Sequence, residues 1–418
     1  MRESLDVGIV GAGTAGSAAA LLLARAGHRV TVYEEVADPQ PVGAGIVLQP
    51  TGQAALARLG LLAPILERGA RLDRLRCATD RGRVILDLAY ADVDARLFGI
   101  GLHRGVLFET LFGAARAEPN VTIRLGTGIE RVEREGARRF AIDARGERHG
   151  PHELLVVADG AGSRIDDPGV RRRVSTYPWG ALWAVLPDPA GVFRRELSQV
   201  VRGAERMLGF LPTGRGPGAG EAEVVSLYWS VRGDRVEQWR SEGLAPWRDE
   251  ILRYEPRAEA LLSAITSSDQ VLYARYRDVV MPRWHGEGIV WLGDAAHAMS
   301  PQLGQGANLA LQDAIALADA LGASSKLEDA LALYTRARRP QLGFYQLATR
   351  WLTPFFQSDA GALGALRDLA MPIAAAVPYL RRRMIRSMAG IERGLVRAAL
   401  PVESVVPKLP ASPRREAA

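Results

Sequence analysis

Three glycines near the N-terminus have the spacing of a turn that can hold a pyrophosphate. Residues 5–16 read LDVGIVGAGTAG, so a short apolar strand leads directly into G-x-G-x-x-G at Gly11, Gly13 and Gly16. In such a turn the first glycine permits the tight bend, the second lets the backbone approach the phosphates, and the third lets the helix pack on the strand. The helix N-terminus adds free N–H groups and the positive end of its dipole. The pattern predicts a dinucleotide site.

An acidic residue follows at the distance that such a site requires. A helical pattern over residues 17–26 stops at Gly27, and a second strand, HRVTVYE, ends on Glu34. A carboxylate at this point accepts hydrogen bonds from an adenosine ribose and repels a ribose phosphate. Glu34 therefore favours FAD or NAD over NADP at this site.

A second glycine-rich segment far along the chain indicates which dinucleotide binds. Residues 288–321 read GIVWLGDAAHAMSPQLGQGANLALQDAIALADAL: a strand ends at Asp294, and GQGAN leads into a long apolar-periodic helix. Asp294 can bond a ribityl hydroxyl. The turn at Gly304 and Gly306 can lay its N–H groups against the pyrimidine edge of a flavin, where the reduced ring carries negative charge. These features favour FAD.

At these residues the chain resembles the single-component FAD-dependent aromatic hydroxylases, the family related to p-hydroxybenzoate hydroxylase, salicylate hydroxylase and the ubiquinone-biosynthesis hydroxylases. Three motifs of that family occur in order between about residues 5 and 340: GAGTAG with Glu34, LLVVADGAGS with Asp159, and GDAAH with Pro301 and GQGAN. The resemblance implies an α/β fold. A Rossmann-like FAD-binding domain of the p-hydroxybenzoate hydroxylase type would carry a second, substrate-binding β-sheet domain and C-terminal helices.

The resemblance also implies where the cofactor and the substrate bind. Arg104 matches a helix-borne arginine that approaches the FAD diphosphate, and the loop at residues 42–50 resembles the one along the isoalloxazine. The residues expected to bind the cofactor are Gly11, Gly13, Ala15, Gly16, Glu34, Gly45, Arg104, Asp159, Asp294, Pro301, Gly304, Gly306 and Asn308. No catalytic residue is assigned; Gln49 and Pro301 are expected near flavin and substrate.

Two aromatic residues are candidates for the substrate pocket beside Gln49. Trp183 and Tyr228 lie on strand-like stretches and can stack on an aromatic ligand, or can equally belong to the core. His297, within GDAAH, is expected to fix local backbone and not to act as a base.

One motif departs from the family pattern. The family usually continues D-G-A-x-S with an arginine at x, whereas this chain has Gly162 there and Arg164 shortly after. The departure concerns the mode of nicotinamide binding and not the FAD site. The sequence contains no second G-x-G-x-x-G, which fits a family that binds NAD(P)H transiently.

The activity implied by the resemblance is that of an FAD-dependent monooxygenase. NADPH or NADH would reduce the flavin, O2 would add at its C4a carbon, and the hydroperoxide would transfer OH to an aromatic or quinone-like small molecule. A flavin-dependent reductase or N-hydroxylase on the same fold and a non-catalytic flavin-binding redox module remain alternatives. The halogenase motif W-x-W-x-I-P does not occur, and no Ser-His-Asp arrangement or metal cluster is readable.

Composition limits the partners and the compartment. The net charge is +6 over 418 residues, yet all basic residues except Lys326 and Lys408 are arginines. Because they are spread along the chain, they indicate GC-rich coding rather than a nucleic-acid partner. The single Cys77 allows neither an intramolecular disulfide nor a thiolate cluster, which suits a reducing cytoplasm. No signal peptide is expected, and the apolar run at residues 18–26 is shorter than the about 20 residues that span a bilayer.

Four regions are expected along the chain. They are a discontinuous FAD-binding domain (1–72, 98–172 and 276–340), a substrate-binding sheet domain (73–97 and 173–275), a helical segment (341–400) and a flexible tail (401–418). The helical segment contains AMPIAAAVPYLRRRMIRSMAGI, with an apolar stretch followed by four arginines. It resembles the C-terminal helices of ubiquinone-pathway members, so peripheral membrane contact and a subunit or domain contact are both open, as is the choice between monomer and homodimer.

Overall fold

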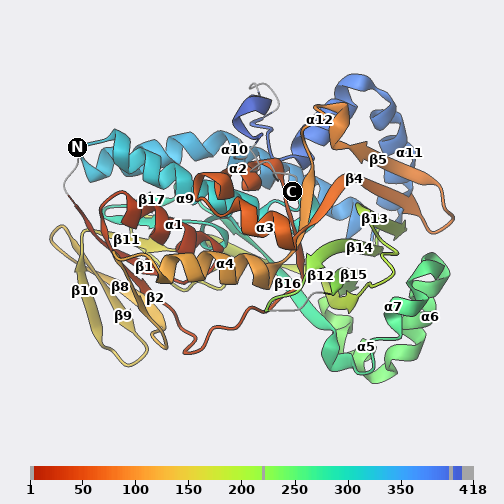
Figure 1. Ribbon diagram of the computed structural model, residues 1–418, viewed down its shortest axis with the longest axis horizontal. Coiled ribbons are helices and arrows are strands. Elements are labelled where there is room, and N and C mark those ends of the chain that lie inside the picture. Colours follow the sequence, from red (N-terminus) through yellow and green to blue (C-terminus); the bar gives the residue numbers. More distant parts are fainter. Residues whose placement is uncertain (1–3, 219–221, 395–398, 407–418) are drawn as a thin grey trace, which may run out of the picture.

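The computed structural model describes residues 4–218, 222–394 and 399–406. Within them, the strands form three sheets. In Figure 1 the molecule has two parts side by side, one built on a parallel sheet and the other on a larger mixed sheet. This is the mixed α/β architecture that the motifs predict.

The parallel sheet carries the first motif. Its order is β17-β18-β11-β1-β2-β7, with all strands parallel except the edge strand β17. The strands are β1 (Asp6–Val10), β2 (Arg29–Tyr33), β7 (Val121–Arg124), β11 (Leu154–Val157), β17 (His285–Gly286) and β18 (Ile289–Trp291). The central strands are short apolar runs buried on both faces, as expected for a covered parallel sheet. The predicted first two strands and the helix between them, α1 (Thr14–Arg25), are confirmed.

Different layers cover the two faces of this sheet. Helices α1, α4 (Arg104–Arg116), α9 (Gly306–Ala323) and α10 (Leu327–Phe356) form one layer (Figure 1). The other is a small antiparallel sheet of β8 (Ile129–Glu135), β9 (Arg138–Asp143) and β10 (Arg148–His152). His152 joins the small sheet to the parallel one: its Nδ1 lies 2.6 Å from Asp6 Oδ1, and its Nε2 lies 2.8 Å from the Tyr33 hydroxyl.

The mixed sheet has the order β16-β12-β15-β14-β13-β4-β6-β3, and β5 pairs with β4. Its strands are β3 (Gly45–Leu48), β4 (Ala70–Thr79), β5 (Val84–Ala89), β6 (Gly99–His103), β12 (Arg173–Pro187), β13 (Arg195–Arg202), β14 (Arg206–Arg215), β15 (Glu223–Arg232) and β16 (Leu272–Val280). The strands predicted at residues 84–90, 180–187, 207–214 and 223–231 are confirmed as parts of β5, β12, β14 and β15.

Three short helices cover one face of the mixed sheet. They are α5 (Val236–Glu242), α6 (Leu244–Tyr254) and α7 (Glu259–Leu262), seen at the lower right of Figure 1. Trp229 of β15 is buried against them, in a cluster with Trp239 and Trp247. Three further short helices are α2 (Pro50–Arg58), α3 (Leu62–Arg68) and α8 (Asp294–His297).

Several of the expected domain limits fall within elements. Residue 276 lies inside β16, and residues 340 and 341 lie inside α10. Strands β3 and β6, from segments assigned to the FAD-binding domain, belong to the mixed sheet. The division into domains stays a prediction.

The C-terminal region is α11 (Gly361–Ala376), α12 (Pro378–Met388) and the chain that follows them. The tail expected to be flexible from residue 401 is structured over 401–406, because Val402–Ser404 forms a 3-10 helix and Val405 is buried against Ile385 and Leu88. Residues 407–418 lie outside the described residues. Among the described helices, none is by itself long and apolar enough to cross a bilayer. Helices α11 and α12, which meet at a bend of 105°, reach that length and composition only together.

Candidate functional site

The glycine-rich turn leaves open space at the start of α1. Gly11 has φ +93°, and a Cβ there would lie 2.7 Å from the Ala158 carbonyl oxygen. A Cβ on Gly16 would lie 1.9 Å from the Gly11 carbonyl oxygen, so both positions exclude a side chain. A Cβ on Gly13 would meet nothing within 4 Å, and no side chain caps the helix. The free N–H groups and the empty space fit a pyrophosphate.

Two carboxylates flank this turn. Glu34 follows β2, and its Oε2 accepts a hydrogen bond from the Ala12 N–H at 2.8 Å. Asp159 follows β11 and touches Gly11. The Oδ1 atom of Asp159 is buried without a hydrogen-bond partner, and burial raises the pKa of this carboxyl group to about 6. An unpaired acceptor at this point suits a ligand hydroxyl.

The third motif lies directly beside the first. Gly293 lies just after the end of β18 and has a φ of +58°. A Cβ on it would lie 3.1 Å from the Cβ of Ala15 in α1. The next residue, Asp294, has an exposed carboxylate without a hydrogen bond or ion pair among the described residues. Its Oδ1 lies 3.8 Å from the Cβ position of Gly306. A free carboxylate next to the start of α9 fits the ribityl chain of a flavin.

The turn before α9 has the expected shape. Pro301 begins a 3-10 turn (Pro301–Leu303), and Gly304 follows in the left-handed region at φ +61°. Arg104 begins α4, and its aliphatic carbons lie over Gly43. Its guanidinium has no ion pair among the described residues, so it is available to a diphosphate.

Asn308 joins the two flavin-side segments to each other. Its buried Oδ1 accepts from the Gln49 N–H at 2.9 Å, and its Nδ2 donates to the carbonyl oxygens of Val47 and Gly304, both at 3.0 Å. The side chain is thus occupied by protein partners, and it positions the loop at residues 42–50 against GQGAN. Gly45 brings that loop to the mixed sheet, since its N–H donates to Ser226 Oγ at 2.8 Å.

His297 is buried below the motif. Its Nε2 lies 2.5 Å from Asp313 Oδ2, and Asp313 also accepts from the Gly293 N–H at 2.9 Å and from Arg338 Nε at 2.6 Å. Burial alone would raise the pKa of Asp313, but the charges of His297 and Arg338 hold it below its ordinary value. The His297 side chain therefore acts on the backbone at Gly293 only through Asp313, whose carboxylate it contacts.

Gln49 is buried, and of its side-chain amide only the oxygen has a hydrogen-bond partner among the described residues. It precedes α2, and its Oε1 accepts from the Tyr90 hydroxyl at 2.6 Å. Burial raises the pKa of Tyr90, which keeps this hydroxyl protonated as a donor. The Gln49 Nε2 has no hydrogen-bond partner among the described residues. Tyr90 carries no sequence motif, and only the pairing of distant segments reveals it.

Trp183 and Tyr228 form a pair on the mixed sheet. They lie opposite each other on β12 and β15, with ring centroids 5.0 Å apart. The Tyr228 hydroxyl accepts from Gln199 Nε2, and its ring packs near Leu352 and Phe355 of α10. In the described part of the chain, no hydrogen bond or ring contact joins this pair to Gln49.

The terminal segment, defined here as residues 387–392, is a part of the site that the sequence did not indicate. Gln305, within GQGAN, donates to the Met388 carbonyl oxygen at 2.8 Å, and Gln341 of α10 donates to the Gly390 carbonyl oxygen at 2.8 Å. A Cβ on Gly390 would lie 2.2 Å from Thr51 Oγ1, so this segment packs closely on the start of α2.

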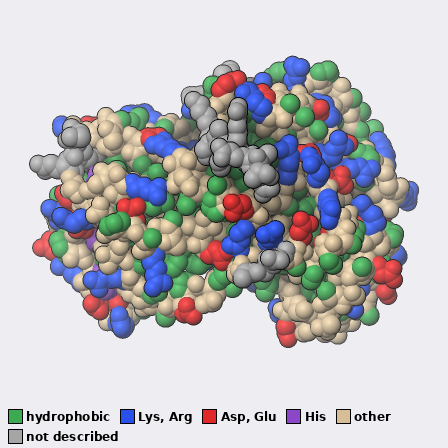
Figure 2. Space-filling model, viewed as in Figure 1, with side chains coloured by type: hydrophobic (Ala, Val, Ile, Leu, Met, Phe, Trp, Pro, Cys, Tyr) green, Lys and Arg blue, Asp and Glu red, His purple; other side chains and the backbone are tan. Residues whose placement is uncertain are grey.

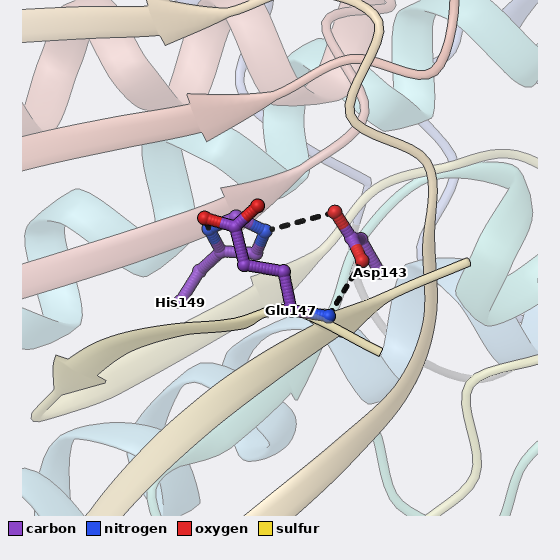
Figure 3. A group of neighbouring side chains, drawn as sticks. All are labelled: Asp143, Glu147 and His149. Carbon is purple, nitrogen blue, oxygen red and sulfur yellow. Dashed lines mark hydrogen bonds and ion pairs between the residues drawn. The ribbon is translucent and has the colours of Figure 1, made fainter. Parts of the chain in front are cut away.

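Asp143, Glu147 and His149 are the described group whose ligand atoms are close enough for a metal ion (Figure 3). The Asp143 Oδ1 already accepts the N–H groups of Arg145 and Glu147, both at 2.9 Å, and Oδ2 lies 3.2 Å from His149 Nε2. These bonds close the turn between β9 and β10 and, against the effect of burial, lower the pKa of Asp143 to about 2. The group is therefore explained by the turn.

Comparison with known proteins agrees with this geometry. A family model described as an FAD binding domain matches residues 4–342. Kynurenine 3-monooxygenase of Salinispora arenicola is 31% identical over 366 residues, 81% of this chain and 77% of that protein. The 6-methylpretetramide 4-monooxygenase of Streptomyces rimosus is 27% identical over 413 residues, 94% of each chain. HpxO of Klebsiella pneumoniae, solved with FAD and uric acid, has the same fold, with a TM-score of 0.76 at 19% identity over 91% of this chain and 97% of that one.

The open glycine turn, the unpaired Asp159 oxygen and the free Asp294 carboxylate meet at one edge of the parallel sheet, and these residues fit FAD. The matched family region contains all three. FAD is the cofactor, with NAD(P)H and O2 as the cosubstrates of this class. The chain belongs to the family of FAD-dependent aromatic monooxygenases.

Proposed function

We propose that the protein adds one oxygen atom from O2 to an aromatic or quinone-like small molecule at the face of the flavin beside Gln49, with NADPH or NADH as electron donor. The observation that carries this assignment is the buried side-chain amide of Gln49. Its Oε1 has a hydrogen-bond partner, and its Nε2 has none among the described residues. When bound, FAD supplies the activation of oxygen, and the protein supplies orientation and the exclusion of water.

The surroundings of Gln49 suit the orientation of a ring. Asn308 holds its backbone and Tyr90 holds its Oε1, so the Nε2 donor is fixed in direction. A fixed donor in a buried place binds a hydroxyl or keto oxygen on a ring and presents a defined carbon for attack. A hydroxyl substituent also makes the ring electron-rich, which the reaction requires. Relatives named for kynurenine and 6-methylpretetramide support a ring substrate of this kind.

The experiment is NADPH consumption in air by the FAD-loaded protein, with mass spectrometry of each mixture. The panel contains simple phenols, hydroxyquinolines, polyketide-like phenols and quinol precursors. One compound should accelerate consumption and gain one oxygen atom on a ring carbon. Oxygen on nitrogen would identify an N-hydroxylase, and loss of a double bond without oxygen gain would identify a reductase; either result contradicts the proposal.

The variant Gln49→Met tests the role of the amide with the accelerating compound. Losing one buried hydrogen bond costs about 1–2 kcal/mol, so KM should rise about tenfold. The share of NADPH that ends as hydrogen peroxide should rise as well, because the ring is no longer held. Tyr90→Phe is the matched control, since it removes only the bond that restrains the amide, and it should raise KM less. Unchanged KM and coupling in Gln49→Met would remove Gln49 from the site.

We also propose that the outer face of α11 and α12 binds an anionic lipid surface. Leu366, Leu369 and Ile373 are 51–61% exposed along one stripe of α11, and Tyr379 and Leu380 continue the apolar surface. The sole acidic residue of these two helices, Asp368, is paired with Arg367. Arg382 is exposed without a carboxylate partner among the described residues. In Figure 2, basic side chains gather on the half of the molecule that contains α12 and β4.

An apolar stripe next to the unpaired Arg382 fits a bilayer of negative charge better than a second copy of this basic chain. The test is co-sedimentation with vesicles of phosphatidylglycerol and with vesicles of phosphatidylcholine. The protein should sediment with the anionic vesicles, and Leu369→Glu with Ile373→Glu should abolish this without loss of bound FAD. Equal failure to bind both vesicles, with a dimer in solution that the two substitutions dissociate, would assign the stripe to a subunit contact instead.

A further inference from the structure

The aromatic pair of Trp183 and Tyr228 shares a face of the mixed sheet with the loop at residues 42–50. Ser226 holds this loop, because its Oγ accepts from the Gly45 N–H at 2.8 Å. Ser226 comes two residues before Tyr228 on β15, and side chains two residues apart in a strand lie on the same face. The intervening residues of β15 pack against α5 to α7 on the other face. The pair therefore lies on the flavin side of the sheet.

The turn before α9 is attached to the same two strands. Gln302 Nε2 donates to Gln357 Oε1 at 3.0 Å, and Gln357 Nε2 donates to the Gly180 carbonyl oxygen at 3.2 Å. Gly180 precedes Trp183 on β12, whereas Ser226 pairs with β12 beyond Trp183. The aromatic pair thus lies between the attachment points of both flavin-side segments. A ring bound between these segments would meet the sheet there.

Tyr228 has a fixed position and a partly exposed ring. The ring lies over Gly209 of β14, where a Cβ would come within 2.0 Å of it. Its hydroxyl accepts from Gln199 Nε2 on β13. The Trp183 ring is partly exposed as well. Aromatic rings that are fixed by the protein and partly exposed offer a flat surface to an aromatic ligand.

The polar groups on this side of the sheet are uncharged. Burial raises the pKa of Tyr228, of Tyr276 and of Tyr90, and within the described chain no carboxylate, guanidinium or ammonium group contributes to these shifts. The groups that do contribute are amides, other tyrosines, an indole and a thiol. Burial also raises the pKa of that thiol, Cys77, to about 12. At neutral pH all four groups are therefore protonated and neutral.

Two arginines next to this face already have partners. Arg367 of α11, whose charge acts on Cys77 against burial, donates from Nε and Nη2 to Asp368 Oδ1 at 2.9 and 2.7 Å. Its Nη1 donates to the Phe355 carbonyl oxygen at 2.9 Å. Arg350 of α10 is paired with Asp278 at 2.9 Å. A carboxylate bound against this face would lose its water without gaining a cation, which is strongly unfavourable.

We propose that the ring substrate is an uncharged molecule, with hydroxyl, keto or amide groups and no carboxylate. This rests on the proposed function, whose substrate class it narrows. Gln49 Nε2 binds an oxygen of the substrate, and Trp183 and Tyr228 contact its ring system. The neutral face discriminates against a negatively charged ring by leaving its charge unpaired.

The experiment measures binding to the oxidised, FAD-loaded protein without NADPH, from the change in flavin absorbance. The probes are matched pairs: a hydroxyquinoline with its carboxylic acid derivative, and a hydroxybenzamide with the corresponding hydroxybenzoate. In each pair the neutral member should bind at least about 100-fold more tightly, because the charged member must give up its hydration. No turnover is needed for this comparison.

A cation placed on the sheet should change the preference. Gln199→Arg puts a guanidinium beside the Tyr228 hydroxyl, so Kd for the carboxylates should fall at least about tenfold, while Kd for the neutral members should change less than about threefold. Gln199→Met removes the same hydrogen bond without adding charge and should keep the preference. Gln238→Arg adds the same charge on the exposed surface of α5, across the sheet, and should leave both Kd values unchanged.

The outcomes separate this inference from the proposed function. Equal or tighter binding of the carboxylates by the unmodified protein would overturn the inference alone, since a charged ring can also gain an oxygen atom. An unchanged preference in Gln199→Arg, or the same change in Gln238→Arg, would overturn it as well, because the sheet would then not set the discrimination. If no member of any pair altered the flavin absorbance, the ring-binding function itself would be contradicted.

Discussion

Glycine serves two different purposes in the turn between β1 and α1. At Gly16 the neighbouring atom is protein, because the Gly11 carbonyl oxygen fills the place of a side chain. At Gly13 no protein atom occupies the position of a side chain, so that space is open to the ligand. The sequence predicted both roles, since the motif's spacing reflects backbone geometry alone. It did not predict Tyr90 or the bridging bonds of Asn308, whose partners lie far away in the sequence.

Alanine at these two positions should separate stability from cofactor binding. Gly13 has φ −68°, which alanine adopts freely, so Gly13→Ala should change the unfolding free energy of the FAD-free protein by less than about 1 kcal/mol. It should nevertheless raise Kd for FAD at least about tenfold, because the new methyl group occupies the phosphate space.

Gly16→Ala provides the contrast. Overpacking against a backbone oxygen should cost the FAD-free protein about 1–3 kcal/mol. Urea unfolding and fluorescence titration of FAD measure the two quantities. Equal destabilisation by the two variants, or unchanged FAD affinity in Gly13→Ala, would contradict the assignment of this turn.

At the scale of elements, α10 connects the third motif to the terminal segment at residues 387–392. Its Arg338 bonds Asp313, which holds Gly293, and also bonds Gln341, which holds Gly390. Sequence periodicity indicates that such a helix has a buried face, but it does not tell which partners the buried polar groups take. The helix therefore transmits the position of the terminal segment to the flavin motif.

Gln341→Ala should release the terminal segment. The expected result is faster loss of FAD on dilution and faster proteolysis after α12, together with about 1–3 kcal/mol of lost stability. Gln346→Ala is the control: Gln346 is also a buried glutamine of α10, but it donates to Val279 and not to the terminal segment. It should lose similar stability and retain FAD. If both variants release FAD equally, stability alone explains the effect.

For the whole molecule, features set by neighbouring residues could be predicted from the sequence, whereas features that depend on pairing between distant segments could not. The first βαβ unit, the third motif and four strands of the mixed sheet were predictable, because apolar runs and glycine spacing are local. The sheet of β8 to β10 and the helices α5 to α7 were not predicted, since charged strands and short helices have weak periodicity. The sequence also did not predict that β3 and β6 belong to the mixed sheet, because this depends on strand pairing across the expected domain limit.

The contact between Gln305 and Met388 also sets an order of events during synthesis. The glycine turn at residues 11–16 and the terminal segment at residues 387–392 are roughly 370 residues apart, and translation at 5–20 residues per second separates them by about 20–75 seconds. A nascent chain therefore exposes its dinucleotide turn well before it can complete the flavin pocket. On this order of synthesis, stable retention of FAD is expected only after the terminal segment has been made.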